Sequence, residues 1–241
     1  MKPQIMNMNE PFVSKNIVPH WPAFDKWNID YFAQHFGHVQ TGNIPVVNGA
    51  CDFNTTTGSR LAYQTLQQAL DYISTGNVAN GVAVATPADV FPDSLKADYP
   101  IPDILKNKHY VRDRIFIGAK DTVTSLHQDL FHNFYTMVKG TKRITLYAPY
   151  APVYPNSRFS KLPNHAQVDP EKPDYKQFPN FKHAHPIVIE LKAGETLFIP
   201  PFWWHHLRNL EESIAVSFWW AQGWTLPLVW LAAQYKKRRG I

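Results

Sequence analysis

The segment from Val123 to Asp129 contains an imidazole and a carboxylate two residues apart, at His127 and Asp129. If the segment is a strand, its side chains alternate between two faces, so these two groups lie on the same face. Together with a second histidine from a distant strand, they can form the 2-His-1-carboxylate triad that holds a non-haem Fe(II) and leaves coordination positions open. The spacing is a weak signal by itself, because 11 His and 19 acidic residues in a chain of 241 produce about one such pair by chance. The hypothesis therefore depends on the rest of the chain.

The residues after this segment predict two strands that face the same interior. Residues 133–138 and 141–148 are joined by Lys139-Gly140, and a two-residue connection that contains glycine is typical of a tight hairpin. The face that we expect to point inward carries Asn133, Tyr135, Met137, Lys142, Ile144 and Leu146. Lys142 is the unusual member of this face, because a buried ammonium is costly unless an anion pairs with it.

A second histidine comes from the C-terminal half. Residues 187–192, 196–199 and 213–220 have the patterns of strands, and His205 and His206 lie between the second and the third of these. Strand alternation allows only one of the two histidines to face inward. Residues 149–182 contain seven prolines and little periodicity, so they predict surface loops. The pair His183 and His185 that follows is interpreted as part of these loops and not as a metal site.

Helices are predicted on both sides of the strands. One is expected over 31–36, capped by Asn28 or Asp30, and another over 61–73, where apolar residues recur at helical spacing. Residues 226–239 predict a C-terminal helix with a basic end. With further strands near 42–58 and 82–85, the fold class is mainly β, a jelly roll with flanking N-terminal helices and a C-terminal helix. One domain is expected over 1–241, with an N-terminal α/β flank at 1–110, the β core at 111–222 and the C-terminal helix at 223–241.

Composition indicates the class of the protein and its compartment more than its function. Hydrophobic residues make up 44% of the chain and aromatic residues 14%, as in a globular protein. Cys51 is the only cysteine, so an intramolecular disulfide is excluded and a reducing, cytoplasmic location is expected. Neither a signal peptide nor a membrane span is expected. The net charge of +5 is compatible with an anionic cosubstrate, an acidic peptide or nucleic acid, and selects none of them.

With these residues in view, the sequence resembles the Jumonji-C (cupin-like) family of Fe(II)- and 2-oxoglutarate-dependent oxygenases. It is most similar to the protein hydroxylases that include the factor-inhibiting-HIF asparaginyl hydroxylase and the small Jumonji lysyl hydroxylases. The first matching block covers 124–142 and begins TSLHQD, and the second covers 191–206 and contains LKAGE, FIP and WWHH. Softer similarity at 10–27 and 218–219 extends the resemblance over most of the chain. It implies a double-stranded β-helix that holds one iron.

The resemblance also implies roles for single residues. His127, Asp129 and His205 match the metal ligands of the family. Lys142 matches the lysine that binds the far carboxylate of 2-oxoglutarate, which agrees with its predicted inward position. The residues that match groups near this cosubstrate are Thr124, Asn133 and Tyr135. One position departs from the family, because Ser217 stands where the family often has Asn before the final Phe-Trp.

The function implied by the resemblance is hydroxylation of an amino-acid side chain in a protein or peptide, with Fe(II) as cofactor and 2-oxoglutarate and O2 as cosubstrates. The alternatives left open are the same chemistry on a modified tRNA base or small metabolite, lysine demethylation, and a non-catalytic metal-binding cupin. Nucleic acid has weak support as a partner, since the sequence contains no strong basic-aromatic array. The chain is expected to be a monomer or a homodimer formed through its C-terminal helix.

Overall fold

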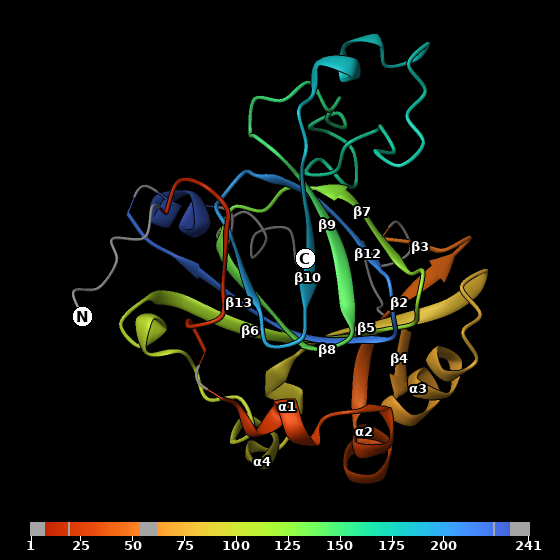
Figure 1. The fold of residues 1–241 in the computed structure, drawn as a ribbon, viewed down its shortest axis with the longest axis vertical. Coiled ribbons are helices and arrows are strands. Elements are labelled where there is room, and N and C mark those ends of the chain that lie inside the picture. The colour runs from red at the N-terminus through yellow and green to blue at the C-terminus, as the bar shows by residue number, and fades with distance from the viewer. Residues whose placement is uncertain (1–7, 19, 54–61, 224, 232–241) are drawn as a thin grey trace.

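The computed structural model describes residues 8–18, 20–53, 62–223 and 225–231, and within these ranges one hydrogen-bonded sheet contains thirteen strands (Figure 1). The strands are β1 (Phe12–Ser14), β2 (Gln40–Val47), β3 (Ala50–Cys51), β4 (Ala62–Thr65), β5 (Asn80–Pro87), β6 (His109–Gly118), β7 (Val123–His127), β8 (His132–Lys139), β9 (Thr141–Tyr147), β10 (Ile187–Lys192), β11 (Thr196–Ile199), β12 (Trp204–Asn209) and β13 (Ser213–Ala221). The α-helices are α1 (Pro22–Lys26), α2 (Ile29–Phe36), α3 (Leu66–Ser74), α4 (Asp93–Lys96) and a further helix at 225–231. The predicted mainly β class is confirmed.

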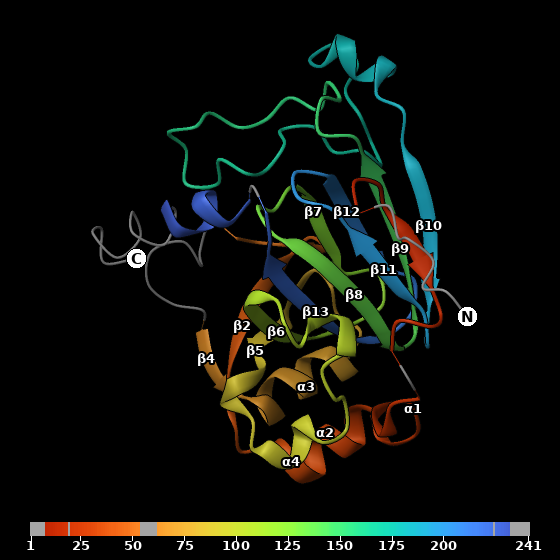
Figure 2. The ribbon, with the colours of Figure 1, turned by 90° about the vertical axis from the view of Figure 1, so that its left-hand side faces the viewer.

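The sheet folds into two layers that form a jelly roll. One layer has the strand order β1-β11-β8-β13-β6-β5-β2, and the other has the order β7-β12-β9-β10. The short strand β3 joins the layers along one side, because it pairs with β2 in antiparallel fashion and with β7 in parallel fashion. The two layers therefore share an interior that is partly closed like a barrel (Figure 2).

Strand alternation separates this interior from a second core under the helices. The buried apolar side chains of the interior are Tyr135, Met137, Ile144, Leu146, Leu191, Leu197, Ile199, Leu207 and Ala215. Their neighbours Phe134 and Val138 of β8 point to the other face, where they pack in one cluster with Trp21, Phe32 and Leu66. The helices α1–α4 gather on that outer side of the larger layer (Figure 2). The larger layer is thus covered on both sides, by the interior on one and by the helices on the other.

The predicted hairpin between residues 133–138 and 141–148 is wrong, although the predicted inward face is right. β8 pairs with β11 and β13, whereas β9 pairs with β10 and β12, so the chain passes from one layer to the other at Gly140. Gly140 has a φ of +77°, and a Cβ atom there would lie 2.3 Å from the carbonyl oxygen of Glu212. The side-chain pattern reports which face of a strand is buried but does not identify the neighbouring strand.

Gly140→Ala is expected to lower the free energy of unfolding by about 2–4 kcal/mol, because it combines a left-handed backbone conformation with a clash against another backbone segment. The matched control is Gly194→Ala, where φ is +84° and no atom lies within 4 Å of the added Cβ, so that only a conformational cost of about 1 kcal/mol remains. Chemical denaturation measures both values. Equal losses would contradict a tight crossing at Gly140.

The segment predicted as one helix over 61–73 divides into a strand and a helix. Residues 62–65 form β4, and α3 begins at Leu66; Leu61 lies outside the described residues. A capping box sets the boundary, since the Thr65 hydroxyl accepts from the Gln68 N–H while the Gln68 side chain accepts from the Thr65 N–H. In α2, Asn28 caps the helix by accepting from the Tyr31 N–H at 2.8 Å, which is one of the two predicted caps.

Residues 149–186 form more than surface loops. They contribute to a buried cluster with the ends of β7, β9 and β12, which contains Leu126, Tyr147, Val153, Val168, Phe178, Phe181 and Trp204. In Figure 1 this insertion lies above the β7, β9 and β12 end of the sheet. The C-terminal helix is present at 225–231, whereas the rest of its predicted length lies outside the described residues. Among the described residues, no helix is long and apolar enough to cross a membrane.

Candidate metal and cosubstrate site

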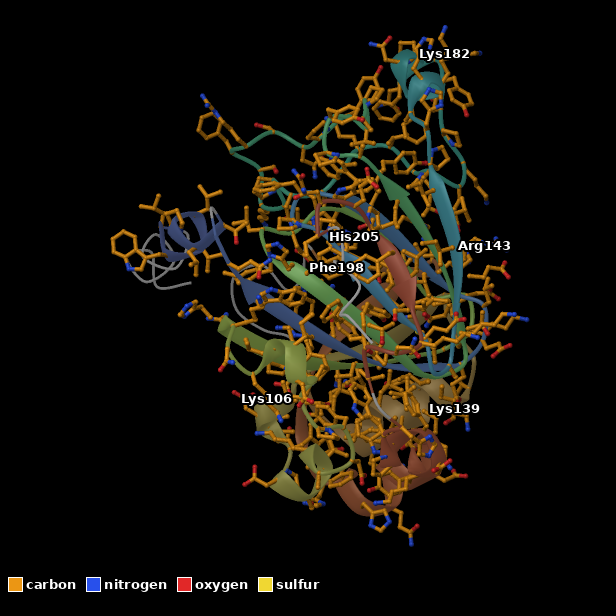
Figure 3. All side chains as sticks on the ribbon, turned by 60° about the vertical axis from the view of Figure 1, so that its left-hand side comes forward. Lys106, Lys139, Arg143, Lys182, Phe198 and His205 are labelled. Atoms are coloured by element: carbon orange, nitrogen blue, oxygen red, sulfur yellow. The ribbon has the colours of Figure 1, made fainter. Side chains whose placement is uncertain are left out.

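His127, Asp129 and His205 lie together between the two layers, close to the insertion. β7 and β12 pair with His127 opposite His205, and the two imidazole centroids are 4.1 Å apart. The Asp129 carboxylate lies 3.7 Å from His205 Nε2. One ligand atom of each residue lies within 4.8 Å of those of the other two. Figure 3 shows His205 inside the molecule, in contrast to Arg143 at its surface. The fold thus brings the three predicted ligands into one compact group.

Both histidines present the ring nitrogen that a metal requires. His127 Nδ1 lies 2.8 Å from the Ser125 carbonyl oxygen, and His205 Nδ1 lies 2.9 Å from that of Trp203. Because a carbonyl oxygen only accepts, each Nδ1 carries the proton and each Nε2 keeps its lone pair. Burial lowers the pKa of His205 well below its usual 6.5, and the neighbouring His127 lowers it further. His205 is therefore neutral at pH 7, as a metal ligand must be.

Asp129 lies beyond the end of β7. The expectation that His127 and Asp129 share one face of a single strand is therefore wrong. The strand ends at His127. The Asp129 carbonyl oxygen accepts from the Phe202 N–H at 2.8 Å, and Phe202 has a φ of +64°, a conformation that bulky residues rarely adopt. This strained turn immediately precedes β12. It ties the Asp129 backbone to the segment that carries His205, and so places Asp129 beside that histidine.

Lys142 lies in the same interior, with no carboxylate partner among the described residues. Its side chain is 6% exposed, and its Nζ donates to the Tyr135 hydroxyl at 2.6 Å. Burial lowers the pKa of Lys142 from 10.5 to about 8 and raises the pKa of Tyr135. A buried cation whose partner within the described chain is a neutral hydroxyl provides a site for an anion.

Thr124 reaches this pocket because β7 contains a β-bulge. His127 lies opposite His205 and Thr124 lies opposite Leu207, so β7 has one more residue than β12 between these pairs. Regular alternation would have placed Thr124 and His127 on opposite faces. The inward position of Thr124 therefore depends on a local irregularity of the strand.

Cys51, at the end of β3, also belongs to the Lys142 pocket. Burial raises the pKa of its thiol to about 11, while the charge of Lys142 and a hydrogen bond with Thr124 oppose that rise. The sequence predicts only that Cys51 belongs to a reducing compartment. Its contact with Thr124 depends on the pairing of β3 with β7, which no spacing rule predicts.

Asn133 is held by the residue that departs from the family pattern. It is buried on β8, and its Oδ1 accepts from Ser217 Oγ at 2.5 Å. The Asn133 Nδ2 forms no hydrogen bond with another described residue, so the amide keeps a donor for a ligand. The structure thus assigns Ser217 a partner, since its hydroxyl orients the amide of Asn133.

Ser217→Ala is expected to lower the free energy of unfolding by about 1–2 kcal/mol, because Asn133 Oδ1 loses its donor in a buried place. The matched control is Ser213→Ala on the same strand. The Ser213 hydroxyl is equally buried but has no hydrogen-bond partner among the described residues, so its removal should be neutral or stabilising. Urea denaturation of both variants measures the difference. A Ser217→Ala variant as stable as Ser213→Ala would contradict the orienting role.

His165 contacts the candidate metal site but was not predicted from the sequence. Its ring stacks on that of His127, with centroids 5.3 Å apart and an interplanar angle of 22°. Its Nε2 is buried without a hydrogen-bond partner among the described residues. The adjacent Ala166 N–H donates to the Leu126 carbonyl oxygen at 2.8 Å, so the insertion runs beside β7. A lone histidine in a proline-rich segment carries no sequence signal of this contact.

A second group of possible ligands lies on the other face of β12. Asp169, Glu171 and His206 also have ligand atoms within 4.8 Å of one another, and His206 points away from His205, as predicted. Both carboxylate oxygens of Glu171, however, accept from the Arg208 guanidinium. Arg208 already supplies the positive charge at this place, so the group is better described as an ion pair beside a buried histidine.

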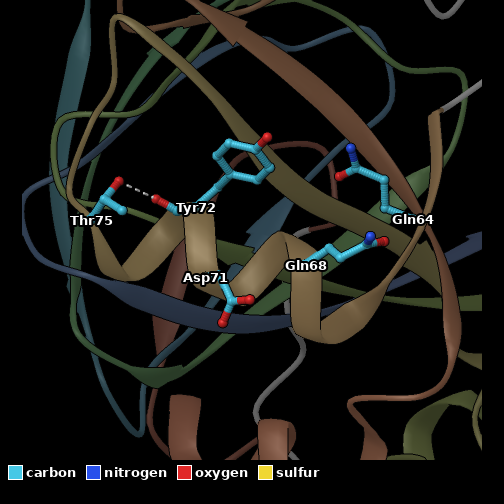
Figure 4. Close-up of a pocket in the computed structure, with 5 residues that line it drawn as sticks. All are labelled: Gln64, Gln68, Asp71, Tyr72 and Thr75. Carbon is cyan, nitrogen blue, oxygen red and sulfur yellow. Dashed lines mark hydrogen bonds between the residues drawn. The ribbon is translucent and has the colours of Figure 1, made fainter.

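Two further surface features lie apart from these clusters. His183 ends a 3-10 helix at Pro179–His183, which corrects its interpretation as a loop residue, whereas His185 lies in the connection before β10, and both side chains are exposed. A shallow hollow along α3 is lined by Gln64, Gln68, Asp71, Tyr72 and Thr75 (Figure 4). It shares no residue with the candidate site.

Comparison with known proteins agrees with this arrangement. A family model described as a cupin-like domain matches residues 1–225. Lysine-specific demethylase 8 of Xenopus tropicalis is 34% identical over 221 residues, which cover 88% of this chain and 48% of that protein. Lysine-specific demethylase JMJ30 of Arabidopsis thaliana is 32% identical over 221 residues, which cover 88% of this chain and 50% of that protein.

A human relative is closer in length. The bifunctional peptidase and (3S)-lysyl hydroxylase JMJD7 of Homo sapiens is 25% identical over 249 residues, which cover 88% of this chain and 77% of that protein. The chain spans about half the length of the two demethylases. The expected similarity to the asparaginyl hydroxylase is not tested by these matches. Because the family model covers nearly the whole chain, this protein belongs to the cupin-like domain family, in the Jumonji-C group that its relatives represent.

Proposed function

We propose that this chain is an Fe(II)- and 2-oxoglutarate-dependent oxygenase that hydroxylates an amino-acid side chain of a protein or peptide. The observation that carries the proposal is the combination of two features in one interior: a compact His127–Asp129–His205 group and a buried Lys142 without an anion among the described residues. A metal site alone fits many functions. A metal site together with an unpaired buried cation fits a ligand that has two anionic ends. One end would bind the metal through two atoms, and the carboxylate at the other end would bind the cation.

The donor set fits a ferrous ion. Two neutral imidazoles and one carboxylate are the ligands of non-haem Fe(II) sites, and they leave coordination positions for other ligands. The Nδ1–H bonds of His127 and His205 to backbone carbonyls keep both Nε2 atoms directed for binding. When bound, the iron supplies the oxidative chemistry that consumes 2-oxoglutarate and O2 and inserts oxygen into a C–H bond of the substrate.

The spacing along the strands fits the cosubstrate. His205 lies opposite Leu146 of β9. Lys142 precedes Leu146 by four residues on β9, so the Cα atoms of these two residues are about 13 Å apart. The long lysine side chain and a five-carbon dicarboxylate together bridge such a span. In this proposal Lys142 and the Tyr135 hydroxyl bind the far carboxylate, Thr124 assists them, and Asn133 Nδ2 donates to the end nearer the metal.

The walls of the interior exclude water from the reaction. Phe116 packs against Tyr135 and Trp219 with ring centroids 5.7 and 6.0 Å apart, and the rest of the cluster is aliphatic apart from Met137 and Trp203. A dry pocket strengthens the electrostatic contacts of Lys142 and limits side reactions. The names of relatives include both a lysyl hydroxylase and demethylases, so the test distinguishes hydroxylation from demethylation.

The test is succinate formation by the purified protein with Fe(II), 2-oxoglutarate and O2, followed by mass spectrometry of proteome-derived peptides. Hydroxylation adds the mass of one oxygen atom to a peptide, whereas demethylation removes a methyl group and releases formaldehyde. Turnover with transfer RNA or metabolite fractions, but with no peptide, would favour the alternative substrates. Metal binding without any 2-oxoglutarate turnover would contradict the proposal and favour a non-catalytic cupin.

A further inference from the structure

Arg114 of β6 projects into the same interior as the proposed cosubstrate residues. It lies opposite Ser217 of β13, and Ser217 lies opposite Tyr135 of β8. Directly opposed residues of paired strands project from the same face of a sheet, so Arg114 shares the face of Tyr135. The three strands lie side by side in Figure 2. The next row of the same face consists of Arg112, Trp219 and Asn133.

The guanidinium of Arg114 has no anionic partner among the described residues. It lies 5.7 Å from the centroid of the Trp219 ring, and it forms no hydrogen bond or ion pair with any described residue. The side chain is half-buried. The adjacent Asp113 does not serve it, because that carboxylate accepts from Tyr99. Asp129 is close enough to influence the pKa of Arg114 but makes no ion pair with it.

The charges of the proposed metal and cosubstrate site balance without Arg114. The exposed Arg112 on the same face adds a further positive charge, and Asp89 influences the pKa of Arg114 without an ion pair. In the proposed complex the two positive charges of the iron and the one of Lys142 offset the single negative charge of Asp129 and the two of 2-oxoglutarate. Arg114 remains as a partly desolvated positive charge near the metal ligands. Such a charge favours an anion and repels a cation at the same place.

We infer that Arg114 binds a carboxylate of the substrate, so that the site accepts acidic peptides in preference to basic ones. This inference rests on the proposed function and specifies its substrate class. Arginine suits the role because its planar fork binds a carboxylate through two parallel hydrogen bonds, and its face stacks on an aromatic ring such as Trp219. The carboxylate belongs either to an Asp or Glu side chain or to the C-terminus of a peptide.

The experiment uses four peptide pools that are identical except at one fixed central position, which is Asp, Asn, Lys or Arg. Each pool is made with a free and with an amidated C-terminus, which separates the two sources of the carboxylate. Two readouts are taken, peptide-stimulated succinate formation and fluorescence anisotropy of dye-labelled pools bound to the metal-free protein. We expect kcat/KM for carboxylate-bearing peptides to exceed that for basic ones by at least about tenfold, the value of one charge-assisted contact.

Arg114→Gln should lower kcat/KM for the acidic pool about tenfold to a hundredfold and leave the basic pool unchanged or improved. Arg114→Glu should reverse the preference toward the basic pools. The matched control is Arg143→Gln, because Arg143 lies at the surface and pairs with Glu190. Circular dichroism melting establishes that each variant is folded, and Arg114→Lys should restore part of the acidic preference.

The outcomes separate this inference from the proposed function. Absence of any 2-oxoglutarate turnover by the wild-type protein would contradict the proposed function. Turnover without a charge preference, or a preference that Arg114→Gln leaves intact, would overturn the inference alone. A raised KM for 2-oxoglutarate in Arg114→Gln, with an unchanged peptide preference, would also overturn it and assign Arg114 to the cosubstrate.

Discussion

Asp129→Ala is expected to abolish metal binding and turnover, while the protein remains folded. Asp129 supplies the negative charge of the proposed triad, and its side chain is 29% exposed, so truncation leaves no sealed cavity. Loss even of groups that only orient metal ligands costs 10- to 100-fold in affinity, and loss of a ligand should therefore cost more than about 100-fold. Turnover should fall by at least the same factor.

The measurement is the shift of the melting transition on adding Mn(II) or Fe(II) under anaerobic conditions. A ligand present at about 100 times its dissociation constant stabilises the folded state by about 2.7 kcal/mol, and this gain should vanish in Asp129→Ala. The matched control is Asp169→Ala, which removes a carboxylate beside the other buried histidine, His206. If Asp169→Ala lost the metal-induced shift and Asp129→Ala kept it, the metal would bind at the group of Asp169, Glu171 and His206 instead, and the prediction would be contradicted.

The inward faces of the strands could be predicted from the sequence, because side-chain period and burial are local properties. Asn133, Tyr135 and Lys142 were expected to face one interior, and they do. The strand neighbours could not be predicted in the same way. A glycine between two strands suits both a hairpin and a crossing between layers, and only the position of Glu212 behind Gly140 distinguishes these.

The parts of the site that sequence analysis missed come from segments with no regular period. The bulge that turns Thr124 inward is a one-residue irregularity and has no signature in residue types. His165 reaches His127 from a long connection, and Cys51 reaches Lys142 through a two-residue strand. Thr124 was identified through the family resemblance, because the family motif contains this position. Strand periodicity alone would have placed Thr124 on the face opposite to His127. It could not supply contacts that depend on how this chain packs its own insertion.

Lys142→Met is expected to have opposite effects on stability and on cosubstrate binding. Burial lowers the pKa of Lys142 from 10.5 to about 8, so at pH 7 the folded protein carries a buried charge that costs on the order of 3 kcal/mol. Methionine has a similar length and no charge. About 1 kcal/mol is subtracted for the lost hydrogen bond to Tyr135. Without 2-oxoglutarate, the free energy of unfolding of the variant should therefore exceed that of the wild type by about 2 kcal/mol.

The pH dependence has a definite sign. The folded-state pKa lies below the unfolded one, so the unfolded chain binds more protons between pH 8 and 10.5, and the wild type gains stability as the pH rises through that window. Binding of 2-oxoglutarate requires the charged ammonium. Its affinity should therefore be constant below pH 8 and fall about tenfold per pH unit above it. Lys142→Met should show neither dependence.

Affinity for 2-oxoglutarate should fall more than about 100-fold in Lys142→Met, because a buried carboxylate then lacks its cationic partner. Isothermal titration calorimetry measures this loss, and Lys139→Met, at an exposed position on β8, serves as the matched control. A variant that is more stable yet binds 2-oxoglutarate normally would place the cosubstrate elsewhere. A variant that loses both stability and binding would show Lys142 to be a structural group. Only a gain in stability together with a loss of affinity identifies a charge that is kept for a ligand.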